Sequence, residues 1–402
     1  MTVCIAGKNK IATHAAAQLL SLQKTADIKL VCCVNQTDTG VDTWQPSLLR
    51  FARMYQVPVL TLEELYTVQD LIFLSLEFDK IIKPSLFKTK RLYNIHFSNL
   101  PSYKGVYTSI MPILNGEHTA GVTLHEIDPG IDTGNIISQR LFPIAETTSG
   151  RELYDLYLQN SIQLYDDNIS AIMEGRITAT VQAVAGSSYY SKKTIDFANI
   201  SIDTNKTAWE IHNQIRAFSF RDYQLPIVGG NKIYRSVILR EKSVRKPGAI
   251  LFQDDQKLVI ASIDYNLELY IDKEDYLFEA CRQGAVENMK QLLAWDFPIH
   301  ICSQKGWNAL IVAAYHGHVD LTYFLLRQGF SLTDTNYQGT TVPMYAMTHA
   351  SRTGDMALLR DILAMNPDLS VTDKTGKNIF WYAKEYNNRE VMDLLAAFHT
   401  PL

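Results

Sequence analysis

The sequence predicts three consecutive architectures: a Rossmann-like α/β domain over residues 1–183, a small β-rich domain over 184–272, and an all-helical repeat array over 273–402. Three observations support this division. Short apolar runs alternate with helical patterns in the first part, and short β-like segments are separated by polar turns in the second. In the third part, a pair of aliphatic residues recurs at spacings of 33, 37 and 32 residues.

The first domain begins with strands over residues 2–7, 28–34 and 57–60, separated by helices over 11–22 and 48–55. This β-α-β-α-β order is typical of a parallel sheet with helices on both faces. The loop over residues 8–10 lacks the G-x-G-x-x-G pattern, so we do not expect a dinucleotide cofactor. Further strands are expected over 71–76, 93–98, 119–127 and 134–143, with helices over 107–116 and 148–175.

Composition excludes several classes of partner. The net charge is −4 and 20% of residues are charged, which gives no electrostatic footprint for nucleic acid or a membrane surface. The five cysteines form no C-x-x-C pair, so we expect no metal site, and Cys4, Cys32 and Cys33 lie in apolar runs that predict buried thiols. No signal peptide or long apolar run is present, so we expect a soluble, cytoplasmic protein.

The stretch that carries chemistry runs from residue 93 to residue 134 and contains Asn94, His96 and Asp132. Asn94 and His96 lie two residues apart on an expected strand, so they share one face. Asn94 has an amide N–H to donate to a developing oxyanion, His96 relays a proton near neutral pH, and Asp132 orients the imidazole. None is an obvious nucleophile, so we expect direct attack by a substrate nucleophile. His118 and His125 lie nearby, and we assign them structural or surface roles.

The run NIHFSNLPSYKG…NGEHTAGVTLHEIDPGIDTGNI resembles the 10-formyltetrahydrofolate-dependent formyltransferases. The shared pattern is Asn-x-His, a Leu-Pro turn, and Asp-x-Gly some three dozen residues later. The resemblance covers residues 1–272, and it implies that Asn94, His96 and Asp132 are catalytic and that 10-formyltetrahydrofolate is the co-substrate. It further implies that main-chain groups of two loops line the pterin pocket, and their residues are Leu76, Lys80, Ile82, Asp128 and Ile131. The alternative for Ile82 is ordinary core packing.

The acceptor substrate is expected near the first turn, the loop after the catalytic strand, and the junction with the second domain. Lys8, Asn9 and Lys10 are candidates for a substrate phosphate, with a solvated loop as the alternative. The motif Ile-Arg-Ala-Phe at residues 215–218 resembles the family's second-domain junction. Aromatic residues there are candidates for base stacking, with core packing as the alternative, and basic ones are candidates for phosphate. The candidate acceptor-binding residues are Asn9, Lys10, Tyr103, Lys104, Lys193, Arg216, Phe218, Phe220, Arg221 and Tyr223.

The tail is similar to ankyrin repeats. GWNALIVAAYHGHVDLTYFLLRQGFSLTD matches their consensus closely, and we expect four helix-pair units, the outer two being caps. Ankyrin arrays usually bind protein. This one is rich in aromatic residues, and we keep a second nucleotide-sugar site as the alternative, with Trp307, Tyr337 and Trp381 as candidates.

Three acceptors compete. Methionyl-tRNA is disfavoured by the acidic balance, and a purine ribonucleotide precursor by the extra C-terminal domains. The chain looks like the dTDP-amino-dideoxyhexose N-formyltransferases of lipopolysaccharide O-antigen biosynthesis, and dTDP-3-amino-3,6-dideoxy-D-glucose is favoured over a 4-amino sugar. The resemblance also implies a homodimer. A different class of function is a non-catalytic ankyrin scaffold that carries a formyltransferase-like domain.

Overall fold

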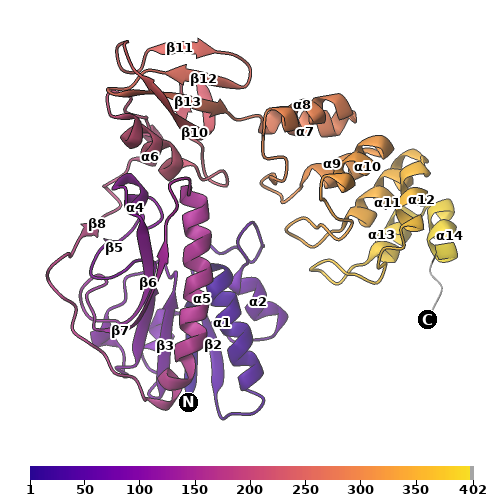
Figure 1. The fold of residues 1–402 in the computed structure, drawn as a ribbon. Helices are drawn as coiled ribbons and strands as arrows, with labels where there is room; N and C mark the ends of the chain where they lie inside the picture. The colour runs from indigo at the N-terminus through magenta and orange to yellow at the C-terminus, as the bar shows by residue number, and fades with distance from the viewer. Residues whose placement is uncertain (399–402) are drawn as a thin grey trace. The chain divides into compact units, whose positions relative to one another are not determined.

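The computed structural model describes residues 1–398, which form two compact units (Figure 1). Unit 1 comprises Met1–Val41 and Gln45–Asp272, and unit 2 comprises Asp42–Trp44 and the residues from Lys273 onward. The predicted fold class is confirmed: unit 1 holds a mixed α/β sheet and a small antiparallel sheet, and unit 2 is helical. The predicted boundary between residues 183 and 184 stays a prediction.

The large sheet has six strands in the order β2-β1-β3-β4-β6-β7. β2, β1, β3 and β4 run parallel, whereas β6 and β7 are antiparallel to their neighbours. The bounds are β1 (Thr2–Gly7), β2 (Lys29–Val34), β3 (Leu71–Leu76), β4 (Leu92–His96), β6 (Thr119–Glu126) and β7 (Ile136–Pro143). The strand predicted over 57–60 is wrong, because that segment makes only an isolated bridge between Cys32 and Val59.

The helices of the large domain follow the predicted order with shifted ends. Their bounds are α1 (Asn9–Leu22), α2 (Leu48–Met54), α3 (Leu62–Leu65), α4 (Met111–Leu114) and α5 (Gly150–Glu174), with a 3-10 turn at η1 (Pro84–Leu86). The loop expected over residues 8–10 is shorter, because α1 begins at Asn9. The helix expected over 107–116 is only one turn long: Tyr107 has a left-handed φ of +65°, so the helical backbone starts after it.

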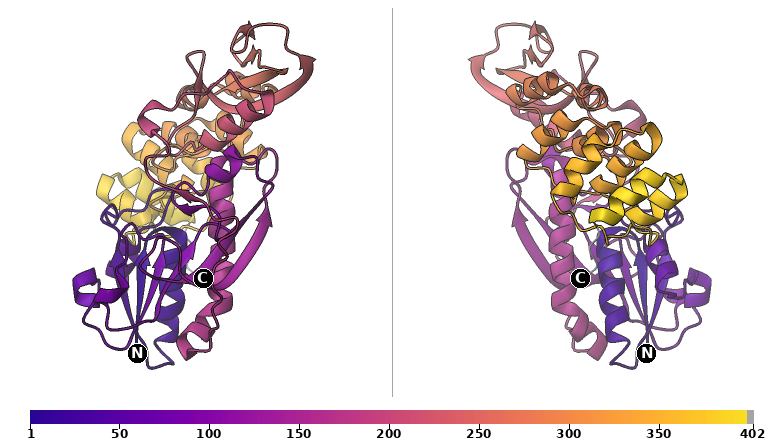
Figure 2. Two further views of the ribbon diagram at one scale, coloured as in Figure 1. Left: turned by 90° about the vertical axis from the view of Figure 1, so that its left-hand side faces the viewer. Right: turned by 90° about the vertical axis from the view of Figure 1, so that its right-hand side faces the viewer.

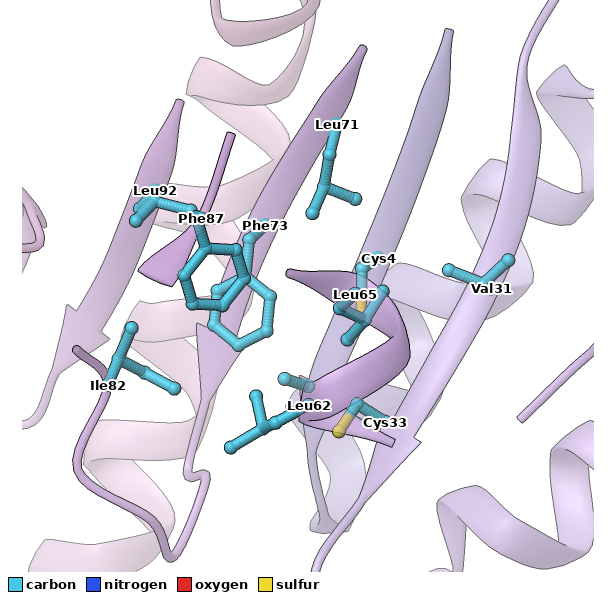
Figure 3. Close-up of a cluster of buried hydrophobic side chains, with 11 residues drawn as sticks. Cys4, Val31, Cys33, Leu62, Leu65, Leu71, Phe73, Ile82, Phe87 and Leu92 are labelled. Carbon is cyan, nitrogen blue, oxygen red and sulfur yellow. The ribbon is translucent and has the colours of Figure 1, made fainter. Parts of the chain in front are cut away.

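The core of this domain lies on both faces of the sheet. α1 and α5 pack against one face, and α3 with the loop around η1 covers the other (Figures 1 and 3). Figure 3 shows Phe73 of β3 and Leu92 of β4 beside Phe87 and Ile82 of that loop. Cys4, Cys32 and Cys33 are buried free thiols, as predicted; burial raises the pKa of Cys32 to about 12 and that of Cys33 to about 11.

The remainder of unit 1 is a five-stranded antiparallel sheet in the order β11-β12-β13-β10-β9. Helix α6 packs on it through Ile211 and Ile215, which share a core with Leu258 and Leu267. The bounds are α6 (Ala208–Phe218), β9 (Ile227–Val228), β10 (Asn231–Lys242), β11 (Ile250–Gln253), β12 (Lys257–Ile260) and β13 (Tyr265–Ile271). Before α6, β8 (Tyr189–Tyr190) pairs with β5 (Lys104–Gly105), and a 3-10 turn, η2 (Phe197–Asn199), follows.

Unit 2 contains four successive helix pairs, as expected for four repeat units. Inner helices α7, α9, α11 and α13 contact one another in series, and each packs on its outer partner (Figures 1 and 2). The pairs are α7 (Glu274–Gln283) with α8 (Val286–Ala294), α9 (Ala309–His316) with α10 (Val319–Arg327), α11 (Val342–Thr353) with α12 (Ala357–Ala364), and α13 (Ile379–Tyr386) with α14 (Arg389–Phe398). None of the helices described within residues 1–398 is long and apolar enough to cross a bilayer.

Candidate active site

The candidate site lies where the parallel strands β1, β3 and β4 end at the same edge of the sheet. Gly7 is in register with Leu76, and Leu76 with Ile95, so the residues that follow each strand emerge side by side. Ligands of open α/β sheets bind at this edge. His96, the last residue of β4, therefore lies at the position where chemistry is expected.

The structure brings Asn94, His96 and Asp132 together. Oδ2 of Asp132 lies 3.6 Å from Nδ1 of His96, and Oδ1 lies 3.4 Å from Nδ2 of Asn94. Within the side chains of His96 and Asp132, only 10% and 13% of the surface is exposed. The charged groups are thus largely shielded from water, which strengthens their mutual attraction.

The orientation of His96 is set by a backbone carbonyl. Its Nε2 lies 2.9 Å from the carbonyl oxygen of Tyr103, which can only accept, so Nε2–H is the donor. Nδ1 then faces Asp132 and carries a proton when the ring is cationic. The geometry therefore suits a protonated His96 beside an ionised Asp132.

Asp132 is held by a loop with little freedom. Its φ is +54°, in the left-handed region, and the backbone N–H of Gly105 donates to its Oδ2 at 2.8 Å. Gln182 anchors the loop further, because its Nε2 donates to the carbonyls of Asp132 and Gly134 at 2.9 and 2.7 Å. A Cβ on Gly134 would lie 1.8 Å from the carbonyl oxygen of Glu126, so only glycine fits there.

The pKa of Asp132 is lowered from 3.8 to about 2 by its neighbours. Burial by itself raises this pKa, but the charge of His96, the nearby ring of His125 and the hydrogen bond from Gly105 outweigh it. The carboxylate is therefore ionised throughout the physiological pH range.

His125 is the residue that sequence reasoning missed. Of the structural or surface roles expected for it, the surface role is wrong, because His125 is 2% exposed and lies beside Asn94, whereas a structural role agrees with this burial. It pairs with Asn94 across β4 and β6, and its Nε2 accepts from Nδ2 of Asn94 at 3.1 Å. Its Nδ1–H donates to the carbonyl of Glu126 at 2.7 Å, which fixes the ring. Only the register between the two strands reveals this contact. His118, in contrast, is exposed.

The residues expected to border a folate differ in exposure and in partners. Leu76 is fully buried, and Ile82 belongs to the core shown in Figure 3. The carboxylate of Asp128 closes a turn by accepting from Gly130 N and Thr133 Oγ1. Lys80 and Ile131 are exposed. Recognition of a folate by main-chain groups of these loops stays a prediction.

The candidate acceptor residues fall into two groups around α5. Asn9 is 2% exposed, and its Nδ2 donates to Glu77 and to the hydroxyl of Tyr154, at 2.8 and 2.7 Å. Phe220 packs 5.8 Å from Tyr154 and 4.8 Å from Tyr223, between ring centroids, and Tyr223 is 61% exposed. Tyr154 therefore contacts Asn9 at the sheet edge through its hydroxyl and Phe220, beside Tyr223, through its ring.

The other candidates differ in accessibility. Lys10 and Lys193 are exposed, and Lys104 Nζ donates to Ser187 Oγ at 3.2 Å. Tyr103 stacks on Tyr190, and its hydroxyl lies 2.7 Å from a Glu117 oxygen.

Two of the basic candidates have structural partners, and Phe218 is core. Arg216 is 5% exposed and donates to the carbonyls of Ala145 and Thr148, so it anchors α6. A role for Arg216 in phosphate binding disagrees with this burial. Arg221 pairs with Asp272 at 2.6 Å, and Phe218 is 7% exposed, as in ordinary core packing.

The three repeat-array candidates have different surroundings. Trp307 forms edge contacts with Tyr315 and Tyr345 at 5.2 and 4.8 Å between ring centroids, while Tyr337 packs over Gly306, whose Cβ position is 2.6 Å from that ring. Trp381 is 38% exposed, with Nζ of Lys377 3.6 Å from its ring centroid. Among residues 1–398, no cluster of side chains is suited to hold a metal ion.

Comparison with known proteins matches the family described as "Formyl transferase" to residues 59–169 and "Ankyrin repeats (3 copies)" to residues 277–353. Methionyl-tRNA formyltransferase of Clostridium novyi is 27% identical over 56% of this chain and 71% of its own length. Methionyl-tRNA formyltransferase of Clostridium beijerinckii is 33% identical over 39% of this chain and 51% of its own length. The matched segments thus span about half to seven tenths of the length of these two curated relatives.

Two solved structures are more similar. WlaRD, a sugar 3N-formyltransferase crystallised with dTDP and 5-N-formyl-THF, is 43% identical, with a TM-score of 0.62, over 67% of this chain and 97% of its own. The N-formyltransferase of Helicobacter canadensis, in complex with folinic acid and dTDP-3-aminofucose, is 43% identical, with a TM-score of 0.61, over 67% and 99%.

The depressed pKa of Asp132 predicts a pH-dependent contribution to stability. A folded-state pKa of about 2 against an ordinary 3.8 stabilises the fold above pH ~4, and this stabilisation is lost as the pH falls toward 2. Asp132→Asn should lower the unfolding free energy near neutral pH. This difference between the two proteins should become about 2 kcal/mol smaller as the pH falls from 4 to 2. Urea unfolding of both proteins across this range measures it, with the exposed Asp255→Asn as control. A difference that does not vary with pH would contradict the assignment.

Proposed function

Because the chain belongs to the sugar N-formyltransferase family, we propose that it transfers the formyl group of 10-formyltetrahydrofolate to a dTDP-linked amino-dideoxyhexose. The preferred acceptor in this proposal is dTDP-3-amino-3,6-dideoxy-D-glucose, in lipopolysaccharide O-antigen biosynthesis in the cytoplasm. The observation that carries the proposal is the constellation of Asn94, His96 and Asp132 at the carboxyl edge of the sheet.

The side chains divide the chemistry of amide formation. The sugar amine attacks the formyl carbon, a new C–N bond forms, the bond to the folate nitrogen breaks, and one proton moves from the amine to that nitrogen. The Nδ1–H of protonated His96, which lies 3.6 Å from Asp132 and makes no short hydrogen bond there, and an N–H of Asn94 donate to the oxygen as it becomes negative. The 3.4 Å contact from Asn94 to Asp132 is long, so this N–H is readily given up to a stronger acceptor.

His125 and Asp132 keep the two donors in place. His125 accepts the other N–H of Asn94 at 3.1 Å, so the amide plane is fixed before substrate arrives. Asp132 balances the charge of His96 and assists the proton transfer. Donors that need no reorientation during the reaction contribute most to its rate.

We propose that the folate co-substrate binds against the two loops that flank the site. The loop after β3 and the loop of residues 128–132 present main-chain groups, and Ile131 offers an exposed apolar side chain at 38% exposure. A flat aromatic ring with N–H donors and acceptors at its rim matches that combination. The two solved relatives were both crystallised with a formylated folate, which supports the same choice here.

The position of the acceptor amine rests on similarity. Both relatives at 43% identity are linked to carbon 3 of the sugar: one is a sugar 3N-formyltransferase, and the other is bound to dTDP-3-aminofucose. The runner-up is dTDP-4-amino-4,6-dideoxyglucose. A scaffold without catalysis is disfavoured by the intact constellation. Methionyl-tRNA stays a competitor because the curated relatives act on it by name.

We propose a homodimer formed through the small sheet. Its edge strand β11 is exposed along all four residues, with Ile250, Leu251 and Phe252 at 47%, 40% and 49%. An apolar edge strand of this kind is a template for pairing with a second copy.

We also propose that the repeat array binds a second nucleotide sugar, with protein docking as the alternative. The support is aromatic: Trp307 lies in a cluster with Tyr315 and Tyr345, and Arg352 lies over Tyr315 at 4.9 Å. Aromatic faces with a cation beside them suit a base and its phosphates.

The acceptor is identified by formyl transfer from 10-formyltetrahydrofolate to three candidates: the 3-amino sugar nucleotide, the 4-amino sugar nucleotide and methionyl-tRNA. The 3-amino sugar should give the highest kcat/KM. If the array holds a second sugar site, velocity plotted against sugar nucleotide concentration should deviate from a hyperbola. The curve should become hyperbolic in Trp307→Ala or Trp381→Ala. Curves left unchanged by both substitutions count against that site, and no turnover of any acceptor favours the scaffold.

The catalytic roles are tested by substitution. Asn94→Ala should lower kcat by 10²- to 10³-fold, or about 2.7–4 kcal/mol, if Asn94 is a main oxyanion donor. His96→Asn should also lose most turnover, because the imidazole that stabilises the oxyanion and relays the proton is lost. The exposed His118→Asn is the matched control and should turn over normally. Full turnover in His96→Asn would overturn the assignment.

The dimer is tested by light scattering. The wild-type protein should have twice the 45.6 kDa mass of one chain, and Phe252→Lys should shift the mass toward 45.6 kDa. Val244→Lys, which changes an exposed residue outside β11, should leave the dimer intact. A wild-type mass of 45.6 kDa would refute the proposal.

A further inference from the structure

Glu77 occupies a position that the catalytic mechanism does not use. It follows β3 directly, and β3 pairs with both β1 and β4, so Glu77 lies between Asn9 after β1 and His96 at the end of β4. Sequence reasoning passed over this residue, because its loop was interpreted only as a folate wall. Its place in the sheet is one strand away from the catalytic imidazole.

The carboxylate of Glu77 is surrounded by donors. Nδ2 of Asn9 donates to Oε2 at 2.8 Å, and the Tyr154 hydroxyl lies 3.0 Å from both carboxylate oxygens. Tyr154 in turn accepts from Asn9 and from Nε2 of Gln45, at 2.7 and 3.0 Å, so its own proton goes to Glu77. A carboxylate accepts about four hydrogen bonds, and these two donors leave acceptor capacity for a ligand.

The backbone is distorted to hold this group in place. Glu77 and Asn9 have φ values of +59° and +65°, which non-glycine residues rarely adopt. The buried side chain of Asn35 stabilises the first of these by donating from Nδ2 to the carbonyl of Glu77 at 3.0 Å. Strained residues that converge on one polar group are typical of a functional site.

The surroundings of Glu77 specify the part of the ligand that it meets. Tyr154 joins Glu77 to Phe220 and Tyr223, the candidate platform for the base, while His96 marks the reacting amine on the other side. In a nucleotide sugar the pyranose carries the amine, and the deoxyribose and the diphosphate connect the pyranose to the base. A carboxylate repels a diphosphate but accepts hydrogen bonds from hydroxyl and amino groups, so it suits the pyranose rather than the phosphates.

We propose that Glu77, held by Asn9 and Tyr154, binds the pyranose of the acceptor through its hydroxyl or amino hydrogens. This inference rests on the function proposed above. Burial raises the pKa of Glu77 to about 6, opposed by the bond from Asn9 and the charge of Lys8, so the group is mostly ionised at neutral pH. An ionised carboxylate also attracts the ammonium form of the sugar as it enters.

The test is isothermal titration of the wild-type protein and Glu77→Gln with dTDP-3-amino-3,6-dideoxyglucose, dTDP-glucose, dTDP and folinic acid. The substitution should lower the affinity for the amino sugar nucleotide at least tenfold. The affinities for dTDP and folinic acid should stay within twofold of the wild-type values. A similar loss for dTDP-glucose assigns the contact to the hydroxyls, and a smaller loss assigns it to the amine. Glu63→Gln, on the exposed face of α3, is the matched control.

Each other outcome overturns the proposal. Unchanged amino sugar binding in Glu77→Gln excludes the contact, and equal loss for dTDP and the amino sugar shows a structural role. If Glu77→Gln does not fold, as judged by folinic acid binding, Tyr154→Phe replaces it. That variant should lose amino sugar affinity severalfold with dTDP affinity retained, and equal losses of both refute the proposal. Failure of the proposed function is separate: the wild-type protein would then bind neither nucleotide nor folinic acid.

Discussion

The register of β4 between its two neighbours is the constraint on which the site depends. β4 runs parallel to β3 and antiparallel to β6, and this pairing sets Asn94 opposite His125 and brings His96 to the sheet edge. A slip of one residue would turn every side chain of β4 to the opposite face. The core formed by Leu92, Phe73 and Phe87 prevents that slip, because these side chains pack tightly on one face only. Leu92 shares a face of β4 with Asn94 and His96, because side chains alternate along a strand, so its packing fixes the strand segment that presents these polar groups.

Several residues with a left-handed backbone conformation lie at the same edge. Asn9, Glu77, Tyr103 and Asp132 all have positive φ, and each either supplies a polar group to the site or holds one in place. Such conformations each cost of the order of 1–3 kcal/mol. The large core of the α/β domain offsets this cost, as expected for a scaffold that supports a preorganised site. The site and the core are therefore energetically coupled through the strand ends.

The sequence allowed the fold class and the catalytic trio to be predicted, because apolar periodicity and motif spacing are local signals. It did not reveal His125, since its contact with Asn94 depends on strand register, nor Glu77, since its partner Tyr154 lies far along the chain in α5. The residues 57–60 looked like a strand because they are apolar, yet only Val59 pairs. Arg216 looked like a phosphate ligand from its motif, and its burial against two carbonyls appears only in three dimensions.

The distribution of thiols gives the molecule a natural handle for chemical labelling. Four of the five cysteines are buried, and burial holds the thiols of the α/β domain in their unreactive protonated form. Cys302, in the repeat array, is exposed. A thiol-specific fluorophore or spin label would accordingly attach to unit 2 and leave the catalytic unit unmodified. The native chain thereby permits spectroscopic study of the repeats during turnover, without cysteine substitutions in the enzyme core.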